Sequence, residues 1–134
     1  GADYGWPDDD TDHSAPSGTV GPIGTWTSHS SLNGLAARPS DSPFPGGEYT
    51  VYGTVFGSWN SVTPVGHEIV RMDFLENSSA AQGWETNITS FAQDLGTPLP
   101  IAFHPSGDYL FYATFSGGGS LHVISMTEDA RPVD

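Results

Sequence analysis

An acidic run near the N-terminus is the first group of residues whose types and spacing suggest chemistry. Asp8, Asp10 and Asp12 alternate in the stretch PDDDTDH, and carboxylates at every second position are oxygen donors that suit Ca²⁺. An EF-hand is excluded, because His13 stands where that loop needs glycine, Thr19 stands where it needs glutamate, and no helical pattern flanks the run. Two interpretations stay open: a calcium loop of another type and, favoured, a solvated acidic loop.

The other reactive residue types form no recognisable catalytic pattern. The chain has no cysteine, which excludes disulfides, zinc–thiolate sites and cysteine nucleophiles. His67, His104 and His122 are scattered among apolar stretches without the spacing of zinc ligands. Ser58 follows a glycine but lacks the strand–turn–helix context of a serine nucleophile. We therefore expect neither hydrolase chemistry nor a zinc site.

Two N-glycosylation sequons suggest a secreted protein. Asn77 begins the stretch NSS and Asn87 begins NIT, and each fits the N-x-S/T acceptor pattern. The alternative is chance, because this pattern is common in a chain rich in Ser and Thr. We interpret the protein as extracellular, with Asn77 and Asn87 as glycan acceptors and with any leader peptide removed or lying upstream.

Charge narrows the set of partners. The chain carries 16 acidic residues and three basic ones, for a net charge of −13, and it has no lysine. This excludes a P-loop lysine and a lysine Schiff base, and it argues against nucleic acid, whose phosphates need clustered cations. An anionic membrane surface is equally unfavourable, and no apolar run approaches the roughly 18 residues of a membrane span. We expect no nucleic-acid partner and no membrane partner.

The elements that must position these residues are β-strands, because no stretch shows a convincing helical period. Residues 1–47 are rich in Gly, Pro, Ser and Asp and predict a loop-rich segment with one or two short strands, with IGTW (23–26) among its apolar pieces. From residue 48 the sequence alternates apolar and polar positions. EYTVYGTVFGSW and HEIVRMDF predict an antiparallel hairpin. The expected faces of this hairpin are Tyr49, Val51 and Val55 against Tyr52 and Phe56, with Val70, Met72 and Phe74 sharing one side.

Further strands complete an all-β chain. TNITSFAQDL predicts a weaker third strand, so residues 48–94 form one blade-like sheet. Residues 95–134 hold the strands LPIAF, YLFYATF and LHVISM, separated by the turns HPSGD and SGGGS, and form a second blade-like sheet and a tail. Residues 109–115 are apolar on both faces, which predicts a strand buried inside a stack of sheets. The spacing fits a sandwich, a barrel or propeller blades.

Three stretches in order resemble one known family. GADYGWP (1–7), SHSSLNGL (28–35) with FPGGEYTVYGTVFGSWNSVTPVGHEIVRMDF (44–74), and LGTPLPIAFHPSGDYLFYATFSGGGSLHVISM (95–126) are similar to signatures of the glucose/sorbosone dehydrogenase family. These are PQQ-dependent sugar and pyranose dehydrogenases built on a six-bladed β-propeller. The resemblance covers nearly the whole chain but only the C-terminal third of the family's fold, about two blades.

The resemblance also implies roles for individual residues. Tyr4 and Trp6 would lie by the cofactor mouth, where aromatic faces suit a flat quinone or a sugar ring; the alternative is a packed turn. His29 would make a polar contact to cofactor or substrate, although a buried histidine bonded between blades is the simpler interpretation. Trp59 and Asn60 end the GSWN strand, where Asn60 would reach a ligand or cap the turn and Trp59 would pack between blades.

Departures from the family's pattern matter for the cofactor. Ser61 and Thr97 stand where the pattern often has basic residues, and arginine and lysine are the natural partners of the three carboxylates of PQQ. The resemblance places the main calcium and PQQ contacts, and the histidine that removes the sugar proton, upstream of Gly1. PQQ and calcium would therefore be held mostly by another segment.

Two functions follow from the resemblance. The first is the C-terminal segment of a secreted PQQ-dependent sugar dehydrogenase-like propeller that oxidises aldoses or pyranoses. The second is a non-catalytic extracellular propeller fragment, glycan-binding or structural, that has lost its cofactor clamps. In either case a two-blade piece leaves apolar sheet faces and a sheet edge open. We therefore expect a partner, which is the remaining propeller segment, a sister chain or a second copy.

Overall fold

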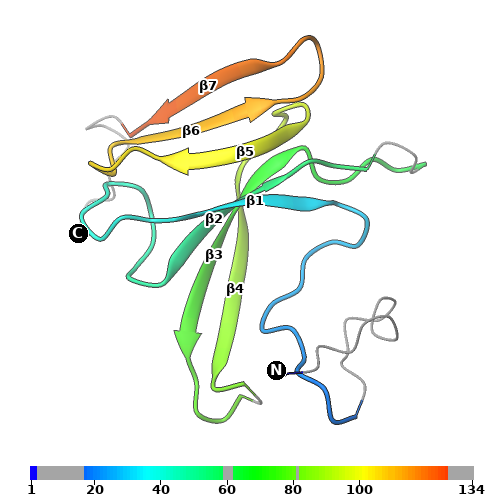
Figure 1. Cartoon of the computed structure of the whole chain (residues 1–134), viewed down its shortest axis with the longest axis vertical. Coiled ribbons are helices and arrows are strands. Elements are labelled where there is room, and N and C mark those ends of the chain that lie inside the picture. Colours follow the sequence, from blue (N-terminus) through cyan, green and yellow to red (C-terminus); the bar gives the residue numbers. More distant parts are fainter. Residues whose placement is uncertain (3–16, 59–61, 81, 127–134) are drawn as a thin grey trace.

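β-branched and aromatic segments form seven strands in the computed structural model, which describes residues 1–2, 17–58, 62–80 and 82–126. They make two antiparallel sheets, one of four strands in the order β1-β2-β3-β4 and one of three in the order β5-β6-β7 (Figure 1). This confirms the all-β, two-blade prediction. The strands are β1 (Leu32–Ala37), β2 (Thr50–Val55), β3 (Glu68–Glu76), β4 (Trp84–Ala92), β5 (Pro98–Phe103), β6 (Tyr109–Thr114) and β7 (Ser120–Ser125).

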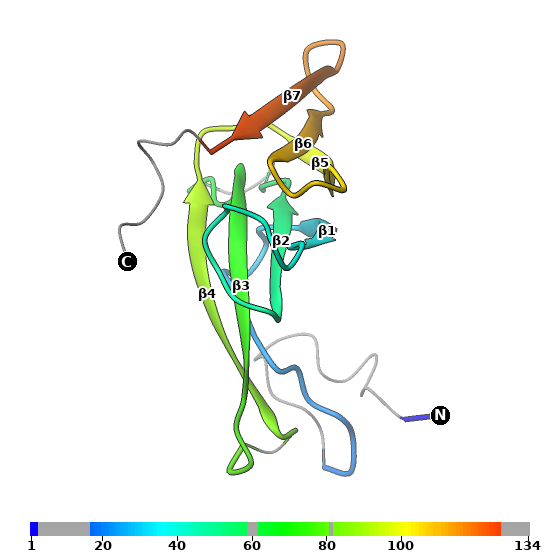
Figure 2. The ribbon, with the colours of Figure 1, turned by 90° about the vertical axis from the view of Figure 1, so that its left-hand side faces the viewer.

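The first sheet is built around the predicted hairpin. β2 and β3 pair antiparallel from Thr50 opposite Asp73 to Val55 opposite Glu68, and β4 then pairs with β3. The fourth member, β1, comes from the loop-rich N-terminal segment. IGTW (23–26) forms no strand; Trp26 instead packs beside Val55, Val70 and Met72. Figure 2 shows β3 and β4 extending as a long hairpin beyond the rest of the sheet.

The alternation of side chains sets two faces on this sheet, as the sequence predicts. Tyr52 is fully buried on the face toward the second sheet. Val55, Val70 and Met72 are buried on the opposite face, where Val51 and Phe74 also pack. Because strand side chains alternate, one register decides both faces at once.

Aromatic rings fill the space between the two sheets. Phe44, from the loop between β1 and β2, is 1% exposed and packs edge-on against Tyr52 and Phe103, with ring centroids 6.1 and 5.3 Å away. Phe91 of β4 lies edge-on to Tyr52 at 4.9 Å. Edge-to-face contacts of this kind contribute roughly 0.5–1.5 kcal/mol per pair beyond area burial. Tyr52 also donates its hydroxyl to the Pro45 carbonyl at 2.6 Å. This cluster fixes one sheet against the other.

Polar contacts hold the sheets close along β1, β2 and β5. The Thr54 hydroxyl donates to the Leu99 carbonyl of β5 and accepts from the Gly34 amide at 2.9 Å. Gly34 has no room for a side chain, because a Cβ there would lie 2.4 Å from the Leu99 oxygen. At the other end of β5, the Ser42 hydroxyl donates to the Gly107 carbonyl at 2.7 Å.

The second sheet differs from the prediction for residues 109–115. β6 is the central strand, and Leu110 and Tyr112 are buried against the first sheet. Its other face is not covered within the described part of the chain: on β7 beside it, Leu121 is 75% and Val123 57% exposed. The apolar pattern on both faces of β6 therefore marks a strand whose second face has no partner among the described residues.

The described residues hold no helix long and apolar enough to cross a membrane.

Candidate functional site

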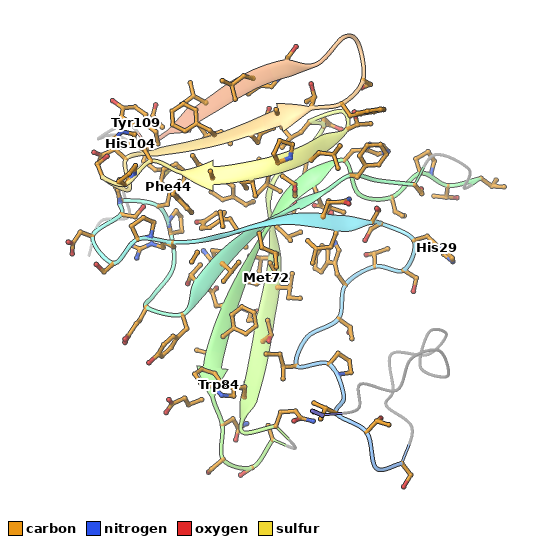
Figure 3. The ribbon with its side chains drawn as sticks, in the orientation of Figure 1. His29, Phe44, Met72, Trp84, His104 and Tyr109 are labelled. Carbon is orange, nitrogen blue, oxygen red and sulfur yellow. The ribbon has the colours of Figure 1, made fainter. Side chains whose placement is uncertain are left out.

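One end of the first sheet gathers the segments that the sequence singles out. Residues 28–31 lead into β1 there, residues 56–58 and 62–67 belong to the connection from β2 to β3, and residues 93–97 connect β4 to β5. Because neighbouring strands are antiparallel, the start of β1 lies beside the end of β2 and the start of β3. Figure 3 shows His29 on this approach to β1 and Trp84 at the opposite end of the sheet.

His29 is exposed at this end, not buried between the sheets. Its backbone is left-handed, with φ 62°, and Ser31 follows with φ 58°. Such angles are uncommon in residues other than glycine and are held here by neighbouring contacts. The Ser30 hydroxyl donates to the Thr27 carbonyl at 2.6 Å, and the side-chain amide of Asn33 donates from Nδ2 to the Ser31 carbonyl at 2.8 Å. The turn therefore presents the His29 side chain to solvent.

The β2–β3 connection is tied down at both of its ends. Gly57 donates its amide to the Ser30 carbonyl at 2.8 Å, which joins the connection to the His29 turn. Ser58 is 7% exposed; its amide donates to the Val65 carbonyl at 3.0 Å, and its hydroxyl accepts from the Val65 amide at 3.1 Å. Ser58 is therefore a residue that closes a loop, in agreement with the absence of a nucleophile pattern around it.

His67 bridges the two connections. Its Nδ1–H donates to the Gly96 carbonyl at 2.6 Å, and the His67 carbonyl accepts from the Leu95 amide at 2.9 Å. Because a carbonyl oxygen only accepts hydrogen bonds, Nδ1 carries the proton, and Nε2 is the unprotonated ring nitrogen in the neutral form. The ring lies against Gly57, where a Cβ would come within 2.4 Å of it. The sequence signals this packing only through its glycines, Gly57 and Gly66, which both adopt positive φ.

Glu68, next to His67, is a carboxylate only 7% exposed. The Trp26 indole N–H donates to its Oε1 at 3.2 Å, and the Ser90 hydroxyl donates to Oε2 at 2.6 Å. Each carboxyl oxygen therefore has a hydrogen-bond partner, as buried polar groups usually do. Glu68 thereby fastens residues 23–26 to the sheet. Sequence reasoning missed this residue, because its partners are 42 and 22 positions away.

Thr97 has a structural role at this end. Its hydroxyl donates to the Ser116 hydroxyl at 2.8 Å and accepts from the Ser116 amide at 2.9 Å. Phe56 and Phe115 lie nearby with ring centroids 6.3 Å apart, and Phe115 is 71% exposed. Thr97, which stands where the family's pattern has an arginine, therefore joins the start of β5 to the end of β6 through hydrogen bonds.

Comparison with known proteins adds one structural relative. No protein-family model matches the chain. No curated protein matches it at a significant level. Among solved structures, the holo form of the pyranose dehydrogenase PQQ domain from Coprinopsis cinerea is similar, with a TM-score of 0.58 and 15% sequence identity. The chain has the fold of part of that domain. The match covers 82% of this chain and 30% of the pyranose dehydrogenase domain chain.

The residues described at the His29 end do not fit PQQ by themselves. The Arg38 guanidinium donates to the carbonyls of Phe44, Pro39 and Ser40, at 2.7, 3.1 and 3.2 Å, and to that of Ser42. Arg71 pairs with the Asp73 carboxylate at 2.9 Å. Both guanidinium groups are therefore engaged elsewhere, and the described part of this end supplies no cation for the carboxylates of that cofactor.

Seven of the predicted site residues lie outside the part of the chain that the structure describes, and the two glycan acceptors lie within it. Tyr4, Trp6, Trp59 and Asn60, together with Asp8, Asp10 and Asp12, lie outside the described residues. Within the described ranges, no three His, Asp or Glu side chains are grouped to hold a metal ion.

The two predicted glycan acceptors are both described. Asn87 is exposed on the edge strand β4. Asn77 is half-buried at the β3–β4 turn. Its side-chain Nδ2 donates to Glu85 Oε2 at 2.9 Å, and its Oδ1 accepts from the backbone N–H of Ser79. Asn87 is therefore the more accessible of the two.

Proposed function

We propose that this chain forms two blades of a secreted, PQQ-dependent sugar dehydrogenase-like propeller that oxidises an aldose or a related pyranose. The observation that carries the proposal is the match of 82% of the chain to the pyranose dehydrogenase PQQ domain. The gathering of residues 28–31, 56–58, 62–67 and 93–97 at one end of the first sheet supports it, since connecting loops at the end of a rigid scaffold commonly form binding sites.

In this proposal the chain shapes the sugar side of the site and leaves the cofactor's charges to other segments. Exposed His29 offers a polar contact to a sugar hydroxyl, and His67 holds the β2–β3 connection in place through Gly96. PQQ and calcium are held mainly by residues outside this chain, because both described arginines are engaged within it. When bound, PQQ supplies the acceptor for the two electrons of the sugar.

The proposed partner is the remaining propeller segment, packed on the open face of the second sheet. Phe111 pairs with Val123 and Ala113 with Leu121, so these apolar side chains share the face turned away from the first sheet. β7 is also the edge of a three-stranded sheet, whereas the first sheet has four strands. β7 carries none of the prolines or charges that usually protect an exposed edge. We propose that another blade covers this face.

The test uses the native particle with all its chains present. Its intact mass should exceed the 14.2 kDa of this chain, and it should show quinone absorbance and sugar-dependent reduction of a dye with PQQ and Ca²⁺. His29→Ala should raise KM for the sugar several-fold, whereas His104→Ala, at the β5–β6 turn, should leave it unchanged. A native particle without quinone absorbance and without dye reduction would contradict the enzymatic proposal.

A non-catalytic extracellular glycan-binding propeller is the second candidate. It is favoured by the absence of a free arginine among the described residues of the first sheet. Glycan-array binding by the native particle, with no turnover of any bound sugar, would support it over the dehydrogenase.

Secretion and glycosylation belong to the same proposal. After expression through a eukaryotic secretory route, we expect a glycan on exposed Asn87, with less occupancy at Asn77, whose amide is bonded to Glu85. Mass loss on treatment with a peptide N-glycosidase, compared between Asn87→Gln and Asn77→Gln, measures each site. A secreted chain without any such mass loss would contradict the assignment of both acceptors.

A further inference from the structure

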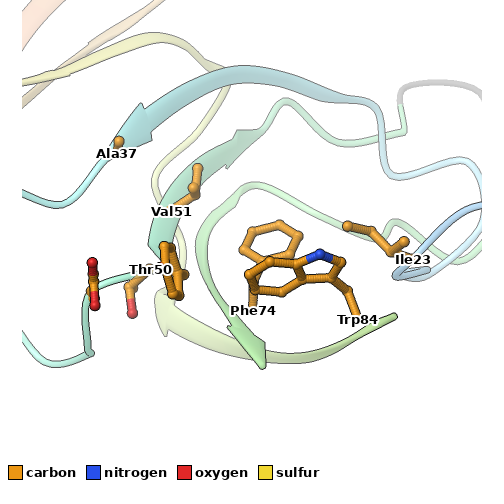
Figure 4. A pocket seen from close by; sticks show the side chains of 8 residues that line it. Ile23, Ala37, Thr50, Val51, Phe74 and Trp84 are labelled. Atoms are coloured by element: carbon orange, nitrogen blue, oxygen red, sulfur yellow. The ribbon is translucent and has the colours of Figure 1, made fainter. Parts of the chain in front are cut away.

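A pocket lies at the opposite end of the first sheet from His29. Its volume is about 340 Å³, and aromatic and aliphatic side chains form nearly all of its wall (Figure 4). We call it the aromatic pocket. It is lined by Ile23, Ala37, Glu48, Tyr49, Thr50, Val51, Phe74 and Trp84.

Three aromatic rings meet at this pocket: Tyr49 directly precedes β2, and Phe74 and Trp84 come from the β3–β4 hairpin. The Tyr49 and Trp84 rings meet edge-on, with centroids 5.3 Å apart and an interplanar angle of 85°. Phe74 is fixed beside them, because its amide donates to the Tyr49 carbonyl at 3.0 Å. In Figure 4 the Trp84 indole lies next to the Phe74 ring, with Val51 and Ile23 to either side. The faces of aromatic rings are negatively polarised and attract cations.

Two carboxylates, those of Glu48 and Glu76, lie at the pocket. Glu48 is part of its wall, and Glu76 pairs with Trp84 across β3 and β4. The Glu48 carboxylate raises the pKa of Tyr49, with smaller contributions from burial and from Glu76. The two described arginines do not offset this charge, because Arg38 is bound to backbone carbonyls and Arg71 to Asp73. The local potential therefore favours a cation.

The pocket offers few hydrogen-bond partners to a ligand. The Thr50 hydroxyl already donates to Asp73 Oδ1 at 2.7 Å and accepts from the Gly47 amide at 2.8 Å. Glu48 is the one charged acceptor in the wall, so a primary ammonium group seated there would replace only part of the hydrogen bonds that it makes to water, which is costly. A quaternary ammonium group has no N–H to satisfy and carries apolar methyl groups.

We propose that the aromatic pocket binds a small quaternary ammonium compound of the choline type, held by the aromatic rings of Tyr49, Phe74 and Trp84 and by the charge of Glu48. This site is separate from the proposed sugar site, because it lies at the other end of β1 to β4. It gives the protein a second ligand class that does not depend on PQQ.

The test compares choline with 3,3-dimethylbutan-1-ol, its uncharged carbon isostere, on the full-length chain at constant ionic strength. Binding is followed by the NMR shift of the Trp84 indole N–H. Choline should bind with a dissociation constant in the millimolar range, and the neutral isostere about fivefold more weakly, as expected for one cation–π contact. Equal or tighter binding of the isostere would overturn the proposal, because the site would then be only apolar.

Matched variants locate the site. Glu48→Gln should weaken choline about threefold, the order of one exposed charge contact, without affecting the isostere; Tyr49→Leu, which removes one of the three rings, should reduce the preference for the cation. Tyr109→Leu removes a comparably exposed tyrosine from the second sheet and should change neither affinity. Circular dichroism confirms that each variant is folded. Unchanged choline binding in folded Tyr49→Leu, or an equal loss in Tyr109→Leu, would place binding elsewhere and refute the assignment.

Discussion

At the residue scale, Tyr52 makes the stability of the core between the sheets depend on pH. The side chain is fully buried, and burial raises its pKa to about 12, although the charges of Arg71 and Arg38 act in the opposite direction. The pKa of a tyrosine in the unfolded chain lies near its ordinary value of 10.0. The folded state therefore favours the neutral phenol, and this contribution is complete below pH 10 and lost as the pH rises toward 12.

We predict that the free energy of unfolding falls by roughly 2–3 kcal/mol between pH 10 and 12 because of Tyr52, since each pKa unit corresponds to about 1.4 kcal/mol. Urea unfolding across this range measures the loss, and absorbance at 295 nm follows phenolate formation. Tyr52→Phe should start less stable, because it lacks the hydrogen bond to Pro45, but should lose most of the steep decline. An identical decline in Tyr52→Phe would contradict the assignment to Tyr52.

At the scale of elements, the close approach of β1 to β5 depends on one glycine. A methyl group at Gly34 would meet the Leu99 oxygen at 2.4 Å and the Thr54 hydroxyl at 2.8 Å, and neither belongs to a flexible side-chain end. Gly34→Ala must therefore separate the two strands or break the hydrogen bonds of Thr54.

We predict that Gly34→Ala lowers the free energy of unfolding by roughly 1–3 kcal/mol, as overpacked sites do. Gly47→Ala is the matched control, because nothing lies within 4 Å of its added methyl group, and its effect should stay within about 0.5 kcal/mol. Thermal and urea unfolding of the two variants measure the difference. Equal stability of both would show that the sheets accommodate the methyl group without cost.

The sequence predicts elements well where a period of two is strong. The faces of Tyr52 and of Val70, Met72 and Phe74 follow directly from alternation, and the structure confirms them. The structure of IGTW (23–26) was harder to predict. A short apolar sequence in a loop-rich segment has the same pattern whether it forms a strand of the sheet or packs as a loop on its face. Local pattern cannot separate these outcomes, since the deciding partner, Glu68, is distant in sequence.

The site was predictable only in part. Sequence similarity singled out His29, but its exposure depends on left-handed backbone at positions 29 and 31. The bridge from His67 to Gly96 joins residues 29 positions apart and leaves no motif. The aromatic pocket likewise depends on which rings the long β3–β4 hairpin brings to Tyr49. Such arrangements follow from tertiary structure and not from spacing along the chain.

At the scale of the whole molecule, the open face of the second sheet is the surface on which we propose that another blade packs. Leu121 and Val123 are more than half exposed on adjacent outward positions of β7, an arrangement that usually marks an interaction surface. If another blade covers this face, a charge placed there must be buried without a partner, which is costly.

We predict that Leu121→Glu weakens association with the remaining propeller segment at least tenfold, measured by native mass spectrometry or sedimentation. Val62→Glu makes the same change of charge at a fully exposed residue outside both sheets, and it should leave association unchanged. If only a dimer of this chain is found, and Leu121→Glu disrupts it, the occupant is a second copy. If neither variant affects any assembly, the open face is not the interface.

The position of Arg71 at the centre of β3 has a consequence for proteolysis. Trypsin cleaves after lysine and arginine but not before proline; the chain has no lysine, and Pro39 and Pro132 follow the other two arginines. The bond between Arg71 and Met72 is thus the single tryptic site, and it lies in a strand paired on both sides, with β2 and β4. Trypsin should leave the folded protein intact and cut it into two pieces, residues 1–71 and 72–134, only when the sheet opens. When reclosing is faster than cleavage, the rate of appearance of these two fragments measures the fraction of molecules that are open at equilibrium, without any label.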